Sequence, residues 1–175
     1  VWIDSENDAK IKRLAGKIDR VLVDAPCSGM GTLRRNPDLK WRQTPVGVLE
    51  LNQKQMNILA SAARLLKSGG RLVYATCSLL PQENQAIADD FLVKHPDFEA
   101  VPAAEALKPL FPKDKFPLGC SPDNPWWQLW PHIHGTDGFF GAVFQKKAAA
   151  PAISPEKDGE KEIKVKTKKV VKELK

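Results

Sequence analysis

The sequence predicts an α/β fold in which helices are wound around a mainly parallel sheet. Short apolar runs alternate with stretches of helical periodicity, in the order strand, helix, strand, helix. The first apolar run ends at a loop with a proline and two glycines, as expected of a buried parallel strand that feeds a functional turn. The chain has 175 residues, of which 42% are hydrophobic, which suits one compact core plus some unpacked sequence. This alternation is typical of doubly wound domains with right-handed crossovers.

The first half of the pattern is a strand followed by a long helix. Residues 20–24, RVLVD, form the apolar run that we assign to the first strand. The spacing of apolar residues then predicts a helix over 44–67, with Thr44 as its cap and Pro45 in its first turn. Residues 68–70, Ser-Gly-Gly, are expected to end this helix.

The second half repeats the pattern and ends in less regular sequence. A second strand is predicted at 71–75, a helix at 81–94 and another strand at 98–101. Residues 102–131 are rich in Pro and Trp and have no periodicity, so we expect an irregular loop that lies over the sheet. The last strand is expected at 139–145.

The remaining sequence, 148–175, is charged and contains no aromatic residue, a composition that predicts a disordered Lys-rich tail. Much of the net charge of +6 and the pI of about 9.2 comes from this tail. The basic balance favours a polyanionic partner. The tail itself fits two interpretations equally well, a nonspecific grip on RNA and a solubilising extension.

Composition also indicates the compartment. No apolar run reaches the length that spans a bilayer, and the first residues do not form a secretory signal segment. The three cysteines, Cys27, Cys77 and Cys120, are odd in number and form no CxxC pair, which argues against a disulfide scaffold and against a tetrahedral zinc site. We therefore expect a cytoplasmic protein with free thiols and no metal.

Two of the cysteines follow the two predicted strands in similar sequence. Asp24-Ala-Pro26-Cys27-Ser follows the first strand, and Ala-Thr-Cys77-Ser follows the second. If the strands are neighbours, about 4.8 Å apart, both thiols face one crevice at the carboxyl edge of the sheet. The dipole of a helix starting near Pro81 would lower the pKa of Cys77. The Asp24 carboxyl group could hold a base ring or a polar group of a cofactor.

These residues resemble motifs of a known family. The stretch DAPCSGMGTLRRNPDLKW is similar to motif IV, and YATCSLLPQEN to motif VI, of the bacterial Sun/Fmu family of 16S ribosomal RNA cytosine-C5 methyltransferases. HGTDGFFGAVFQK resembles the closing strand hairpin of that family, so the resemblance runs from about 17 to 147. It implies the C-terminal half of a Rossmann-like class I methyltransferase sheet over 1–147.

The resemblance also implies residue roles. In the family the cysteine of motif VI adds to C6 of cytosine, which makes C5 nucleophilic toward the methyl group of S-adenosylmethionine, so Cys77 is expected to be the nucleophile. Cys27 is expected to assist release of the methylated base. Asp24 is expected at the cytosine edge and, with Pro26, at the cofactor. Three alternatives stay open: a transfer RNA substrate, a non-catalytic RNA-binding protein, and a DNA methyltransferase in which Cys27 would attack.

Other side chains near the motifs have simpler interpretations. Trp126, Trp127 and Trp130 are expected to pack rather than to stack on bases, and Cys120 is expected to be incidental. His132 and His134 lack a third ligand at metal spacing. The residues expected to contact RNA phosphates, beside Trp41, are Arg34, Arg35, Lys40 and Arg42.

The Gly-rich turn with which the family mainly binds S-adenosylmethionine does not occur before Asp24, and neither Asp4 nor Glu6 aligns with the family's acidic cofactor residue. We therefore expect a fragment of a longer enzyme that alone binds the cofactor weakly or not at all. A sheet that lacks strands exposes an edge, and self-association through that edge is a further expectation.

Overall fold

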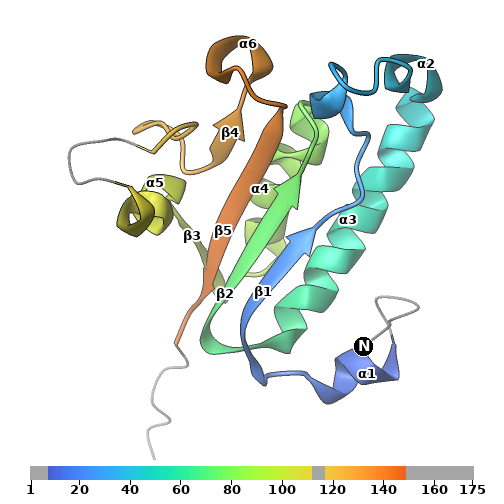
Figure 1. Ribbon diagram of the computed structural model, residues 1–175. Helices are drawn as coiled ribbons and strands as arrows, with labels where there is room; N and C mark the ends of the chain where they lie inside the picture. Colours follow the sequence, from blue (N-terminus) through green and yellow to red (C-terminus); the bar gives the residue numbers. More distant parts are fainter. Residues whose placement is uncertain (1–7, 112–116, 149–175) are drawn as a thin grey trace, which may run out of the picture.

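A computed structural model describes residues 8–111 and 117–148 as one five-stranded sheet with helices (Figure 1). The strands are β1 (Ile18–Asp24), β2 (Leu66–Thr76), β3 (Phe98–Val101), β4 (Trp127–Leu129) and β5 (Phe139–Lys146). The α-helices are α1 (Ala9–Arg13), α2 (Leu39–Arg42), α3 (Pro45–Leu65), α4 (Gln85–Lys94), α5 (Ala103–Leu107) and α6 (Pro131–His134). Short 3-10 helices are η1 (Met30–Thr32), η2 (Pro81–Glu83) and η3 (Lys108–Leu110). Across the described ranges, no helix has the length and apolarity needed to cross a membrane.

The strands form a mixed sheet in the order β1-β2-β5-β3, with β4 also paired to β5. β1 and β2 are parallel neighbours, and Asp24 lies opposite Ala75, which confirms the predicted adjacency of the two cysteine-bearing strand ends. All the other pairs are antiparallel, so the expectation of a mainly parallel sheet is wrong outside β1 and β2. The chain enters β5 from the segment at the carboxyl ends of β1 and β2, and β5 therefore runs in the opposite direction (Figure 1).

Three predicted boundaries need correction. The long helix has the expected cap, since the Gly47 N–H donates to Thr44 Oγ1 at 3.1 Å, but it ends at Leu65, and 68–70 belong to β2. The helix predicted from 81 begins as the 3-10 turn η2, and α4 starts only at Gln85. β4 lies inside the stretch expected to be irregular. Its short strand pairs with β5, a long-range contact that local periodicity does not reveal.

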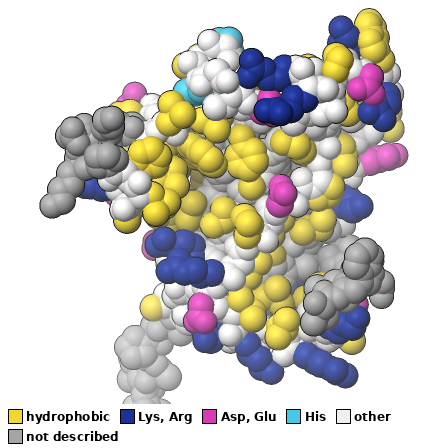
Figure 2. All heavy atoms as spheres, viewed as in Figure 1, with side chains coloured by type: hydrophobic (Ala, Val, Ile, Leu, Met, Phe, Trp, Pro, Cys, Tyr) yellow, Lys and Arg dark blue, Asp and Glu magenta, His cyan; other side chains and the backbone are white. Residues whose placement is uncertain are grey.

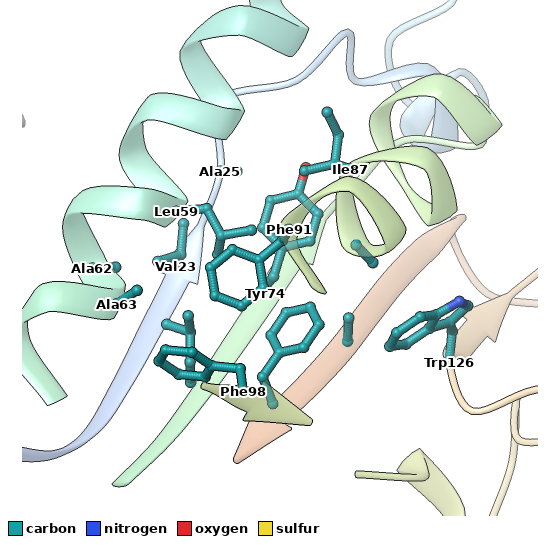
Figure 3. Packing of buried hydrophobic residues seen from close by; sticks show 14 of the residues in the cluster. Val23, Ala25, Leu59, Ala62, Ala63, Tyr74, Ile87, Phe91, Phe98 and Trp126 are labelled. Atoms are coloured by element: carbon teal, nitrogen blue, oxygen red, sulfur yellow. The ribbon is translucent and has the colours of Figure 1, made fainter. Parts of the chain in front are cut away.

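The core lies between the sheet and helices α3 and α4, which cover one of its faces (Figure 3). Leu59 from α3 and Phe91 from α4 are buried against Tyr74 of β2 and Phe144 of β5. Trp126 is 6% exposed and its ring lies 5.9 Å from that of Phe144. This packing agrees with the structural role predicted for Trp126.

The opposite face of β1, β2 and β5 is bare among the described residues, and no helix lies in front of it in Figure 1. Leu22 is 68% exposed there, and the sheet register places it beside Val73, which in turn lies beside Val143. Figure 2 shows hydrophobic side chains across this face. The sheet therefore has one covered face and one apolar face that nothing in the described ranges packs against.

Candidate active site

The sulfur atoms of Cys27 and Cys77 lie 3.4 Å apart, within hydrogen-bond distance. Each thiol follows the carboxyl end of a strand, Cys27 after β1 and Cys77 after β2. The parallel register brings these ends together, and the last backbone bond of the ladder joins the Ala25 N–H to the Ala75 carbonyl at 2.9 Å. The expectation that both thiols share one crevice fits this geometry.

The two thiols have opposite pKa shifts. The pKa of Cys77 is lowered to about 7, first by the hydrogen bond with Cys27, while burial and the charges of Asp24 and Glu83 act against this shift. The pKa of Cys27 is raised far above its ordinary value, first by the same hydrogen bond and then by burial. Cys27 therefore keeps its proton and donates it toward a Cys77 thiolate. Both thiols remain free and partly exposed.

The cause of the Cys77 shift differs from the predicted one. We expected the dipole of a helix starting near Pro81 to lower the pKa, but this turn is a 3-10 helix of three residues, and α4 starts eight residues after Cys77. The neighbouring thiol is the leading cause. The low pKa of Cys77 is therefore a property of the cysteine pair.

Glu83, which is not predicted from the sequence as a site residue, has a buried carboxylate that contacts the two thiol-bearing turns. Glu83 is 0% exposed and accepts hydrogen bonds from the Ser28 and Ser78 hydroxyls at 2.5 Å each. It also accepts from the Ser28 N–H at 2.8 Å and from the Gln55 side-chain amide at 3.2 Å. The sequence evidence for this contact is the repeated Cys-Ser dipeptide, which places one serine directly after each thiol.

Backbone contacts at a glycine fix the turn after Cys27. The Gly31 N–H donates to the Cys77 carbonyl at 2.8 Å, and the Gly138 N–H donates to the Gly31 carbonyl at 2.8 Å. A Cβ atom at Gly31 would lie 2.6 Å from the Cys77 carbonyl oxygen and would also collide with the Gly138 carbonyl. Only glycine permits this approach of three chain segments.

Asp24 and Pro26 are both exposed at the end of β1. The Pro26 carbonyl accepts a hydrogen bond from the Gln55 side chain at 2.9 Å, whereas the Asp24 carboxyl group has no hydrogen-bond partner among the described residues. An exposed, unsatisfied carboxyl group beside the thiols suits a polar group of a cofactor or a base. The sequence predicts a cofactor contact for these two residues, and no Gly-rich turn occurs in the sequence before Asp24.

The four basic residues predicted to contact RNA are exposed and fall into two groups. Arg34 donates to the Gly135 carbonyl at 3.0 Å, and Arg35 pairs with Asp137 at 2.6 Å, so both hold the loop before β5. Lys40 and Arg42 lie on α2. Lys40 sits 4.9 Å from the Trp41 ring centre, and Arg42 pairs with Asp38 at 2.6 Å. Figure 2 shows Lys and Arg side chains gathered at this end of the molecule.

None of the remaining candidates is among the causes of the pKa shifts of Cys27 and Cys77. Cys120 is a free cysteine, and His134 accepts a hydrogen bond from the Trp130 N–H at 2.8 Å. His132 is exposed. Within the described ranges no group of three His, Cys, Asp or Glu side chains is arranged to hold a metal ion. Asp4, Glu6 and nearly all of the Lys-rich tail lie outside the described residues.

A family model described as "16S rRNA methyltransferase RsmB/F" matches residues 3–145. The chain is 40% identical over 146 residues to the probable ribosomal RNA small subunit methyltransferase B of Synechocystis sp., covering 83% of this chain and 31% of that protein. The protein of the same description from Bacillus subtilis is 40% identical over 131 residues, covering 75% of this chain and 28% of the relative. The chain thus spans about a third or less of these relatives.

Two solved structures have similar folds. The crystal structure of PH0851 is 39% identical, with a TM-score of 0.63, over 75% of this chain and 27% of that one. The structure of NSun6 from Pyrococcus horikoshii with SFG is 27% identical, with a TM-score of 0.63, over 85% of this chain and 34% of that one.

Proposed function

The chain belongs to the 16S rRNA methyltransferase RsmB/F family, and we propose that its two thiols carry out methylation at C5 of a cytosine in small-subunit ribosomal RNA. The observation that carries the proposal is the Cys27–Cys77 pair, with sulfur atoms 3.4 Å apart and opposite pKa shifts. Residues 1–147 would form part of the methyltransferase domain, and the Lys-rich tail from 148 would lie outside it.

Cys77 is the proposed nucleophile. Since its pKa is lowered to about 7, a large fraction of this thiol is thiolate near neutral pH. The thiolate would add to C6 of the cytosine ring, forming a C–S bond and moving the π electrons of the C5–C6 bond toward C5. C5 then becomes a carbon nucleophile that can accept a methyl group. Bound S-adenosylmethionine would supply that methyl group.

Cys27 is the proposed release group. Its raised pKa depends first on the hydrogen bond with Cys77, and the Cys77 charge also contributes. Once Cys77 is bonded to carbon, that charge is gone, so Cys27 loses its proton more easily. The Cys27 thiolate could then take the C5 proton, after which the C5–H electron pair re-forms the double bond and the C–S pair returns to Cys77.

The cofactor would be held in part by Asp24 and Pro26, at the exposed end of β1. The Asp24 carboxylate, which has no hydrogen-bond partner within the described ranges, can accept hydrogen bonds from a polar ligand. Because the Gly-rich turn is missing before Asp24, we expect this chain alone to bind S-adenosylmethionine weakly or not at all. Titration calorimetry with the 175-residue chain tests this, and tight binding would contradict it.

RNA would reach the thiols from the end of the molecule that carries the basic residues. The exposed Trp41 side chain, 80% accessible, offers a stacking surface next to Lys40. Arg34, Arg35 and Arg42 add positive charge that favours phosphates.

The deciding experiment is a transfer assay with the longest natural protein that contains this chain. Labelled S-adenosylmethionine is incubated with unmodified small-subunit ribosomal RNA, with transfer RNA and with DNA, and the labelled base is identified. We expect 5-methylcytosine in the ribosomal RNA, and a Cys120→Ala variant should retain this activity because Cys120 contributes to the pKa shift of neither thiol of the pair. Label in transfer RNA alone, in DNA alone, or in no substrate would contradict the proposal.

A further inference from the structure

The Glu83 carboxylate is buried completely and is paired with polar hydrogens rather than with a cation. No Lys, Arg or His in the described ranges forms an ion pair with it. Its four hydrogen bonds come from Ser28, which donates twice, and from Ser78 and Gln55. A buried carboxylate is costly unless such donors satisfy it, so its place in the fold calls for a specific reason.

The bonds of Glu83 connect the two thiol-bearing turns. Ser28 follows Cys27 directly and Ser78 follows Cys77 directly, and the same oxygen, Oε2, accepts from both serine hydroxyls. The two hydroxyls lie 3.2 Å from each other, as expected of groups that converge on one acceptor. A shift of either turn away from the other would break one of these bonds.

The carboxylate acts where the backbone no longer holds the two strands side by side. The β1–β2 ladder ends with the bond from the Ala25 N–H to the Ala75 carbonyl. Beyond this bond, the turns that carry Cys27 and Cys77 are joined by the hydrogen bond from the Gly31 N–H to the Cys77 carbonyl and by side-chain contacts. The η2 turn, closed by the Glu83 N–H to the Leu80 carbonyl at 3.0 Å, returns the chain so that Glu83 lies beneath both turns.

We propose that Glu83 is the positioning residue of the thiol pair, tying the Cys27 and Cys77 turns together so that the two sulfur atoms stay within hydrogen-bond distance. Glu83 touches neither sulfur in this role. It acts through Ser28 and Ser78. Calling the pair catalytic rests on the proposed function, whereas the coupling of the two turns does not.

Loss of positioning and loss of negative charge at Glu83 would shift the pKa of Cys77 in opposite directions. The Cys27 hydrogen bond is the largest cause of the lowered Cys77 pKa, while the negative charge of Glu83 raises it. Removing Glu83 therefore lowers the Cys77 pKa if charge alone matters. It raises that pKa if the turns separate and the thiol hydrogen bond is lost.

The test measures the alkylation rate of each cysteine against pH in the 175-residue chain, with iodoacetamide and peptide mass mapping. In Glu83→Ala we expect the Cys77 pKa to rise from about 7 toward the ordinary 9.0. At pH 7 its alkylation should slow by roughly tenfold, because the loss of thiolate outweighs the greater reactivity of each thiolate. Glu83→Asp keeps the charge but shortens the reach, and should show the same direction of change even if the alanine variant does not fold.

Tyr74→Phe is the matched control. Tyr74 is equally buried and donates to the backbone carbonyl of Glu83 at 2.7 Å, but it bonds to neither serine. This variant should lose stability without raising the Cys77 pKa. An unchanged or lowered Cys77 pKa in Glu83→Asp, or an equal rise in Tyr74→Phe, would overturn the proposal. The assay uses neither RNA nor cofactor, so its outcome is separate from that of the methylation assay.

Discussion

The turns after β1 and β2 contain the same dipeptide, Cys-Ser, and both serines donate hydrogen bonds to the same buried carboxylate. Their thiols nevertheless differ, since the pKa of Cys77 is lowered to about 7 and that of Cys27 is raised. One hydrogen bond between the two sulfur atoms is the largest cause of both shifts. Similar local sequence therefore gives two thiols of different acidity, because each turn forms part of the environment of the other.

Removal of the proposed attacking thiol should have the largest effect on activity. Cys77→Ala should abolish methyl transfer, with a loss of at least about a thousandfold, because it removes the thiolate that is proposed to add to C6. The measurement is transfer of label from S-adenosylmethionine to unmodified RNA by the longest natural protein that contains this chain. Substantial transfer by this variant would show that the two roles are assigned wrongly.

Removing the other thiol should give a different failure. Cys27→Ala leaves the nucleophile but removes the release group, so a covalent protein–RNA adduct should accumulate and turnover should fall by about a hundredfold or more. The adduct is detected as a band of reduced mobility on a denaturing gel. The same band in Cys77→Ala, and not in Cys27→Ala, would reverse the assignment.

The difference in acidity between the two thiols can be measured by titration without substrate. The thiolate is the reactive form, so alkylation of wild-type Cys77 should rise with pH and reach half its maximum near pH 7. In Cys27→Ala the stabilising hydrogen bond is lost, and the midpoint should move upward toward 9.0. Cys120→Ala serves as the control and should keep the midpoint near 7. A Cys27→Ala midpoint that stays near 7 would mean that the neighbouring thiol is not the cause.

The smallest expected effect concerns RNA binding by α2, which follows the Cys27 turn and has no counterpart after Cys77. Lys40→Ala should weaken RNA binding a few-fold and reduce the slope of log affinity against log salt by about one, as loss of one phosphate contact predicts. Binding is measured by filter retention at several salt concentrations. Lys94→Ala, on the distant helix α4, is the control. Equal losses in both variants would indicate general electrostatics rather than a defined RNA path.

The sequence allowed prediction of those features that local patterns and motifs encode. The two cysteine-bearing strands, their adjacency and the capped helix from Pro45 are confirmed. The antiparallel course of β5 and the strand β4 depend on long-range pairing, for which periodicity gives no evidence. Glu83 was missed for a similar reason. A glutamate in a polar stretch resembles a solvent-exposed residue until the fold brings two serines 55 and 5 positions away to its carboxylate.

The backbone contacts of Gly31 limit how the thiol pair can be moved into another protein. Gly31 contacts both the Cys77 turn and the loop at Gly138, so the three segments are closely packed against one another. Moving the Cys27 motif alone into another scaffold would leave its glycine facing a foreign surface. A transplant of this chemistry should therefore carry all three segments as a unit, although the first and the last of them lie more than one hundred residues apart along the chain.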